Sequence, residues 1–302
     1  MPCWERLPQK GPMMCETGVK QRKIGEVLRV KPLAALAMID EGELDRKIVA
    51  ILLNDPKASL VNDGESERLR ENMALGVAAL PFTFVAHLLA VAGIVMVLVW
   101  NIHFRGGLAW EATNKNLIFN IHPVLMLIGL IIIGGEAIIS YKSLPLKKEV
   151  KKLIHLVLHA IALILGIIGI IAAFKNHNES GIANLYSLHS WLGIGVIVLY
   201  GTQWLYGFVT FYYPGGTSIL RSQSLPWHVL FGLIVYVLAV GTASLGFLEK
   251  LTFLESSGLA KYGSEALLVN FTAIVTILYG AFVVLSAISQ APATAEDDYA
   301  PI

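Results

Sequence analysis

The chain from Met73 onward is a series of long apolar runs separated by short polar stretches. A helix advances about 1.5 Å per residue, so roughly 20 apolar residues are needed to cross the hydrocarbon core of a bilayer. Aromatic side chains such as Trp100 and Trp227 gather at the ends of these runs, as they do at membrane interfaces. Pro226 falls just before the fifth run, where a helix start tolerates its missing amide donor. The pattern predicts six transmembrane helices, at 79–102, 117–141, 153–174, 188–212, 227–248 and 267–289.

Composition also indicates a membrane protein with several crossings. Of the 302 residues, 55% are hydrophobic and only 15% are charged, and the mean hydropathy is +0.65. The 23 basic and 22 acidic residues nearly balance, which gives no indication of nucleic-acid binding. Cys3 and Cys15 both precede the apolar runs, so the sequence has no CxxCH motif for covalent haem and no iron–sulfur motif. The expected fold class is an all-α membrane protein.

Residues 1–72 differ from the rest of the chain. They hold 12 of the 23 Lys and Arg and 12 of the 22 Asp and Glu. The start, MPCWERLPQK, is charged and contains Pro, so we expect no cleaved secretory signal and a cytosolic N-terminus. The runs VLRV and KIVAILL, separated by an acidic turn, predict short strands of a soluble extension.

Part of this extension, from about Cys15 to Asp63, resembles the soluble inorganic pyrophosphatase family through the run AMIDEGELDRK. The resemblance implies that Asp40, Asp45 and Lys47 correspond to acidic metal ligands and a phosphate-contacting lysine. The family's DGDP-type cluster of aspartates is missing from the sequence, and so short a fragment cannot bury a core of its own. We expect 1–72 to be a fused fragment without pyrophosphatase activity, and 73–302 to be the membrane domain.

The distribution of short-loop lysines predicts the orientation in the membrane. The loop between the second and third helices carries five of them, Lys142, Lys147, Lys148, Lys151 and Lys152, whereas the opposite loops carry one or two each. Positive charge favours the cytosolic side. We therefore expect this loop, the 213–226 loop and both termini to lie in the cytosol.

Four histidines near the ends of apolar runs form the candidate chemistry. His122 and His189 begin the second and fourth helices near the non-cytosolic face, and His155 and His228 begin the third and fifth near the cytosolic face. An ionisable side chain at such a depth needs a partner inside the protein. Two imidazoles on one iron fill both axial positions, which favours electron transfer over oxygen activation. The sequence predicts two non-covalent haems b in a core of helices two to five, held by His122 with His189 and by His155 with His228.

Other buried polar residues leave further interpretations open. His159 lies one turn beyond His155, and we expect it to make a local hydrogen bond, with His87 and His103 as packing or interfacial residues. The sequence leaves two roles open for Glu136, a proton relay and a simple contact with water. A proton or small-anion transporter without haem would explain buried ionisable residues, but not matched histidine layers. A zinc hydrolase could use the HxxxH pair, but no acid follows His155 at the HExxH position.

A set of ordered motifs resembles the ascorbate-reducible cytochrome b561 family over about Phe84 to Leu285. These motifs are HFRGGLAW, FNIHPVLM, GGEAIISYKS, KKLIHLVLHA, NLYSLHSWLG, QWLYGFVTFYYPGG, LPWHV and EALLVN. The resemblance implies a six-helix protein with two b-type haems that carries electrons from cytosolic ascorbate across a membrane. The family's haem ligands correspond to the same four histidines.

The resemblance also implies two substrate sites. The cytosolic ascorbate site corresponds to Lys148, Lys152 and Arg221, and the site on the opposite side to His177 and Tyr186. Because ascorbate is a monoanion at neutral pH, cations would raise its local concentration. Cytosolic lysines also contact anionic membrane lipid, so this alternative stays open for them.

The expected activity is that of a transmembrane ascorbate-dependent oxidoreductase. Its acceptor would be monodehydroascorbate or a ferric chelate. Family members occur in vacuolar, lysosomal, vesicle and plasma membranes, so the sequence does not identify the membrane. It also leaves open whether the protein forms a homodimer.

Overall fold

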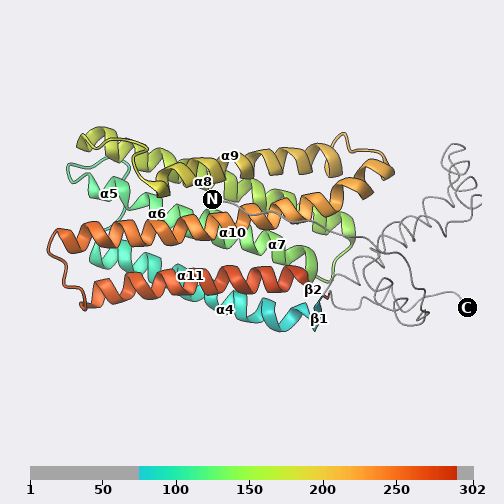
Figure 1. The fold of residues 1–302 in the computed structure, drawn as a ribbon, viewed down its shortest axis with the longest axis horizontal. Helices are drawn as coiled ribbons and strands as arrows, with labels where there is room; N and C mark the ends of the chain where they lie inside the picture. The colour runs from blue at the N-terminus through green and yellow to red at the C-terminus, as the bar shows by residue number, and fades with distance from the viewer. Residues whose placement is uncertain (1–74, 291–302) are drawn as a thin grey trace, which may run out of the picture. The chain divides into compact units, whose positions relative to one another are not determined.

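A computed structural model of the chain describes residues 75–290. Six helical spans within this range are long and apolar enough to cross a membrane, and they run along one common axis (Figure 1). They are Ala79–Phe104, Asn116–Ser143, Lys148–Ser180, Leu188–Tyr212, Ser218–Ser256 and Ser264–Ile288. The prediction of an all-α protein that crosses a membrane six times is confirmed. The predicted strands VLRV and KIVAILL lie outside the described residues.

Several spans combine α-helical and π-helical segments. The first is α4 (Ala79–Leu98) followed by η1 (Val99–Phe104). The second is α5 (Asn116–Phe119), α6 (Ile121–Leu125), η2 (Met126–Ile133) and α7 (Gly134–Ser143). The others are α8 (Lys148–Ser180), α9 (Leu188–Gly207) with η3 (Phe208–Tyr212), α10 (Ser218–Ser256) and α11 (Ser264–Ile288).

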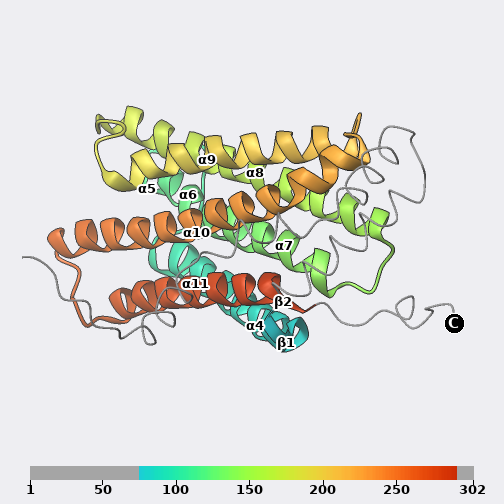
Figure 2. The same cartoon turned by 45° about the vertical axis from the view of Figure 1, so that its right-hand side comes forward.

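The spans lie in three pairs (Figures 1 and 2). α4 packs along α11 on one side of the bundle, and α8 lies with α9 on the other side. Between these pairs run the second span and α10, which contact both sides. The second to fifth spans therefore form a four-helix core, and α4 and α11 cover one face of it.

One end of the bundle carries a small sheet. The strands β1 (Leu75–Ala78) and β2 (Ser289–Gln290) pair in parallel and tie the start of α4 to the end of α11. The Lys142 ammonium, at the end of α7, donates to the carbonyl oxygen of Ser289 at 2.7 Å. We call this the strand end of the bundle, and the other the opposite end.

The fifth span is longer than predicted. Its helix begins at Ser218, where the Thr217 hydroxyl accepts a hydrogen bond from the Leu220 amide at 3.3 Å. Pro226 therefore lies inside α10 and not at its start, so that expectation is wrong. The apolar pattern marks only the membrane-crossing part of a helix, whereas the preceding polar turns are helical because they are capped. Arg221, expected in a loop, lies on α10.

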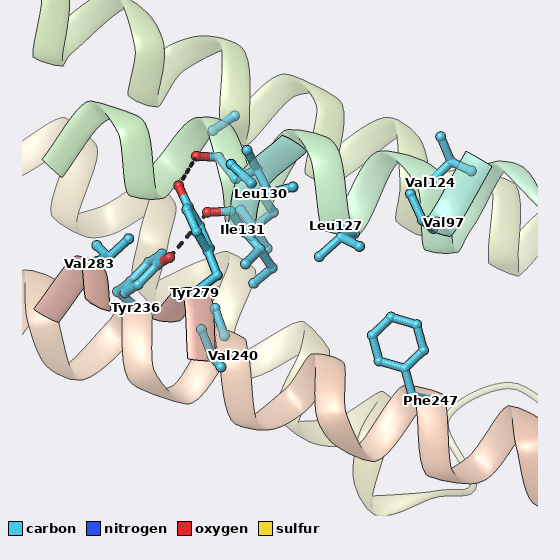
Figure 3. Packing of buried hydrophobic residues seen from close by; sticks show 14 of the residues in the cluster. Val97, Val124, Leu127, Leu130, Ile131, Tyr236, Val240, Phe247, Tyr279 and Val283 are labelled. Atoms are coloured by element: carbon cyan, nitrogen blue, oxygen red, sulfur yellow. Dashed lines mark hydrogen bonds between the residues drawn. The ribbon is translucent and has the colours of Figure 1, made fainter. Parts of the chain in front are cut away.

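Two tyrosines stabilise the π-helix in the second span (Figure 3). A π-helical turn interrupts the regular α-helical ladder, and an unpaired carbonyl inside a membrane is costly. The Tyr236 hydroxyl donates to the Ile131 carbonyl at 3.3 Å, and the Tyr279 hydroxyl to the Ile132 carbonyl at 2.8 Å. Gly135 permits this approach, because a Cβ there would lie 2.7 Å from the Tyr236 oxygen.

We expect Tyr279→Phe to destabilise the fold by about 1–3 kcal/mol, because it leaves a buried carbonyl with one partner fewer. The purified full-length protein in detergent would be heated while its tryptophan fluorescence is followed. Tyr262→Phe is the matched control, because Tyr262 is 90% exposed in the loop before α11. Equal unfolding temperatures for the two variants would contradict this role of the Tyr279 hydroxyl.

Candidate functional site

The structure brings the four candidate histidines together as two pairs. The ring centres of His122 and His189 are 6.0 Å apart near the opposite end, and those of His155 and His228 are 6.3 Å apart near the strand end. In each pair the two rings face one another across the four-helix core. One pair comes from the second and fourth spans, and the other from the third and fifth. The topology predicted these two pairings, and the distances agree with it.

Each core helix takes part in both histidine layers. It supplies a histidine to one layer, and at the other layer it supplies the residue that contacts a histidine from a neighbouring helix. On three helices these two residues are fourteen positions apart: His155 and Gly169 on α8, His189 and Gln203 on α9, and His228 and Thr242 on α10. At about 1.5 Å per residue, the two layers are roughly 21 Å apart along the helix axes.

Three of the histidines donate from Nδ1 to a backbone carbonyl oxygen. His122 donates to Gly169 at 3.1 Å, His155 to Ala137 at 2.9 Å, and His189 to Thr242 at 2.9 Å. A carbonyl only accepts, so Nδ1 carries the proton in the neutral ring. The lone pair of Nε2 is then free to bind a metal, with the ring orientation fixed by the neighbouring helix.

His228 is held by a side-chain amide instead. The Gln203 amide nitrogen lies 3.0 Å from His228 Nδ1 and donates to the His228 carbonyl oxygen at 2.7 Å. A metal bond through Nε2 requires the proton on Nδ1, and the amide then has to present its oxygen to the ring. Among the partners of the four histidines, Gln203 is therefore the one that can present either a donor or an acceptor to the ring.

A cavity adjoins each histidine pair. The one beside His122 and His189 has a volume of about 230 Å³, and the one beside His155 and His228 about 250 Å³. Two imidazoles bound to one metal through bonds of about 2 Å have ring centres about 6 Å apart, which agrees with both pairs. The residues present thus fit a planar metal-centred cofactor such as a haem between the two rings of each pair.

Glycines let the neighbouring backbones approach the rings. A Cβ at Gly246 would stand 2.7 Å from Cε1 of His189, and one at Gly207 would stand 2.9 Å from Cε1 of His228. Any side chain at these positions would push the imidazole out of place. The small residues at these two positions therefore serve the histidine layers.

Positive charge surrounds the cavity at the strand end. Lys152 lines the cavity and pairs with Glu149 at 2.9 Å. Lys148 and Arg221 do not line it, but both interact electrostatically with Glu149, so the three predicted cations share one carboxylate. Arg221 lies seven residues before His228 on α10, which is about two turns along the same helix face.

The cavity at the opposite end holds the second predicted pair. The rings of His177 and Tyr186 have centres 6.5 Å apart, and both residues line this cavity. Burial, together with the Glu249 carboxylate, raises the pKa of the Tyr186 phenol, so this residue is a neutral hydrogen-bonding group at physiological pH.

Several polar residues of these cavities were not predicted from the sequence. Lys142 lines the cavity at the strand end, and Glu249 and Lys250 line the other. In the sequence, Lys142 counted only toward membrane orientation. No sequence signal separated Glu249 and Lys250 from ordinary charges at a helix end.

Two of the remaining histidines have side-chain hydrogen-bond partners. His159 Nδ1 lies 2.5 Å from the Tyr200 hydroxyl, which confirms the predicted local hydrogen bond. His87, predicted to be a packing or interfacial residue, is half-exposed and lies 3.1 Å from the Glu136 carboxylate, a contact that the sequence did not predict. Glu136 also accepts a hydrogen bond from the Tyr279 hydroxyl at 3.2 Å. Within residues 75–290, no three His, Cys, Asp or Glu side chains form a metal-binding group.

A helical membrane bundle with facing imidazoles beside cavities at both ends has the architecture of a membrane-bound b-type cytochrome. Sequence comparison agrees. The sequence model of eukaryotic cytochrome b561 matches residues 121–254. A second model, of inorganic pyrophosphatase, matches residues 13–75.

Three relatives illustrate the similarity. Transmembrane ascorbate ferrireductase 1 of Arabidopsis thaliana is 73% identical, over 72% of this chain and 91% of its own length. Probable ascorbate-specific transmembrane electron transporter 1 of rice, Oryza sativa subsp. japonica, is 68% identical, over 76% and 99%. Transmembrane ascorbate-dependent reductase CYB561 of Mus musculus is 40% identical, over 73% and 89%. The chain belongs to the cytochrome b561 family, and this membership implies a b-type haem.

We expect Gly246→Ala to displace the His189 ring and so to lower the bound b-type haem. Overpacking costs about 1–3 kcal/mol, which weakens haem retention roughly 5- to 150-fold. The measurement is the haem absorbance per protein after purification. Gly241→Ala on the same helix is the control, because a Cβ there meets nothing within 4 Å. Equal haem loss in both variants would contradict the proposed crowding at His189.

Proposed function

We propose that this protein is an ascorbate-dependent oxidoreductase that carries electrons across a membrane to monodehydroascorbate or a ferric chelate. The observation that carries the proposal is the presence of two histidine pairs, one at each end of the same four-helix core. The names of the relatives supply the donor, ascorbate, and one acceptor class, ferric iron. Electron transfer across a bilayer requires a redox carrier near each face.

In this proposal each histidine pair holds one haem b, His122 with His189 and His155 with His228. When bound, the haem would supply one-electron redox chemistry, and two histidine ligands would favour electron transfer over oxygen activation. The protein fixes both imidazoles before binding, through the Nδ1 contacts to neighbouring helices. Little reorganisation of the ligands is then needed when the charge of the site changes.

The strand end faces the cytosol in this proposal. It carries Lys142, Lys147, Lys148, Lys151 and Lys152 close together in the sequence, as the cytosolic sides of membrane proteins do. With six crossings, the chain before α4 and the chain after α11 lie on the same side, so both termini are cytosolic. Residues 1–72 take no part in electron transfer, and the membrane domain is 73–302.

Ascorbate would bind beside the cavity at the strand end. Lys152 provides a cation at the cavity wall, and Lys148 and Arg221 add positive potential around it. This potential concentrates the ascorbate monoanion near His155 and His228. At the opposite end, His177 and Tyr186 offer hydrogen-bonding groups to the acceptor.

The haem assignment is tested by removing one ligand at a time. We expect His122→Ala and His189→Ala to lose one component of the reduced-minus-oxidised spectrum, and His155→Ala and His228→Ala to lose the other, each about half of the haem. His103→Ala is the control, because its ring packs edge-on against Phe104. Loss of the same component in all four variants would refute the pairing. Proteoliposomes that contain ascorbate should reduce an external ferric chelate only when both components are present.

The donor site is tested by charge removal. We expect Lys152→Ala with Arg221→Ala to slow reduction by ascorbate about tenfold or more, because each charge contributes about 1 kcal/mol even at water-like screening. Reduction by a neutral, membrane-permeant reductant should keep its rate, and added salt should mimic part of the loss. Lys147→Ala with Lys151→Ala removes the same charge from residues outside the group that shares Glu149, and neither of them lines the cavity. Equal slowing with both reductants would place the donor site elsewhere.

A further inference from the structure

Lys250 is a cation in the wall of the cavity beside His122 and His189. It lies on α10, one helical turn beyond Gly246, the position whose Cβ would collide with the His189 ring. Its ammonium is 4.1 Å from the ring centre of Phe119, and that ring lies 5.8 Å from the ring of His122. The Lys250 side chain thus lies at the edge of the His122–His189 pair, on the side nearer the opposite end of the bundle.

The charge of Lys250 lacks a carboxylate partner within residues 75–290, where no ion pair to it is present. Glu265 attracts Lys250 from beyond ion-pair distance, and Arg105 repels it. Glu265 is itself engaged, because it accepts hydrogen bonds from Trp100 and Arg105. Glu249 directly precedes Lys250 on the helix, but its carboxylate interacts with the Tyr186 phenol at the wall of the cavity.

The lysines at the mouth of this end are neutralised instead. Lys115 pairs with Glu179 at 2.6 Å, and Lys175 pairs with Glu111 at 2.8 Å. Within residues 75–290, Lys250 thus lies in the partly buried cavity wall without an ion pair, whereas Lys261, also without one, is exposed in the loop before α11. The face of Phe119 offsets part of the desolvation cost of the cation, and an anion in the cavity would offset the rest.

We propose that Lys250 pairs with a propionate carboxylate of the haem held by His122 and His189, which rests on the proposed function. A porphyrin is wider than an imidazole, so a haem between these rings extends past them toward the next turn of α10, where Lys250 lies. The propionates are the only charged substituents of haem b. A free acceptor would instead meet His177, in the last turn of α8, and Tyr186, in the loop after α8, first.

This pairing makes Lys250 a positioning residue that sets the redox potential of one haem. A fixed cation favours the reduced form, which carries one negative charge more than the oxidised form. The pairing would thus raise the midpoint potential of the haem near the opposite end above the value it has without Lys250. A higher potential at this haem favours electron transfer from the ascorbate side toward the acceptor side.

The test is an optical redox titration of the purified full-length holoprotein. We expect Lys250→Met to lower the midpoint potential of the component that His122→Ala removes, with a roughly tenfold smaller ratio of reduced to oxidised haem at a fixed potential. Lys250→Arg should restore most of this loss, and the other component should not change. Lys261→Met, at an exposed loop position, is the control for removing a lysine charge at the same end.

Several outcomes decide the proposal. An unchanged midpoint potential with a raised KM for the ferric acceptor would overturn it, because Lys250 would then bind the free acceptor. An equal shift in Lys261→Met would also overturn it, since a distant charge would suffice. If Lys250→Met loses this haem while Lys250→Arg retains it, the pairing is supported; loss in both overturns it. A wild-type protein without this haem would instead refute the proposed function.

Discussion

The structure depends on one constraint, that a neutral imidazole inside a membrane must have a partner for its Nδ1 proton. For three of the four histidines this partner is a carbonyl on an adjacent helix. For His228 the Gln203 amide nitrogen faces Nδ1, and the amide has to turn its oxygen to the ring to accept the proton. Each contact joins two helices of the core, and each of the four histidines lines a cavity. The same contacts therefore stabilise the bundle and prepare the metal-binding geometry.

The second span shows what this constraint requires of a helix. On α8, α9 and α10 the residues that serve the two layers are fourteen positions apart, but His122 and Ala137 are fifteen apart. The π-helix Met126–Ile133 lies between them and accommodates the additional residue. Tyr236 and Tyr279 then satisfy the carbonyls of this irregular segment. The two tyrosines thus support the geometry of both histidine layers without touching either.

Sequence reasoning found the parts of the structure that depend on burial along one segment. Apolar length predicted the six crossings, and helix direction predicted which histidines share a depth. It could not find contacts between distant segments, such as His87 with Glu136 or Lys142 with Ser289, because no local pattern encodes them. Polar helical turns, like those before Pro226, carry no apolar signal either. Lys250 was missed for a related reason, since only the folded cavity shows that its charge is uncompensated.

The central claim is that two histidine layers in one four-helix core hold two haems. It is tested most directly by pyridine haemochrome analysis of the purified chain, with protein quantified by amino-acid analysis. Two non-covalent haems b per chain are expected, extractable with acidic acetone because the sequence has no CxxCH motif. One haem per chain, or none, would contradict the claim.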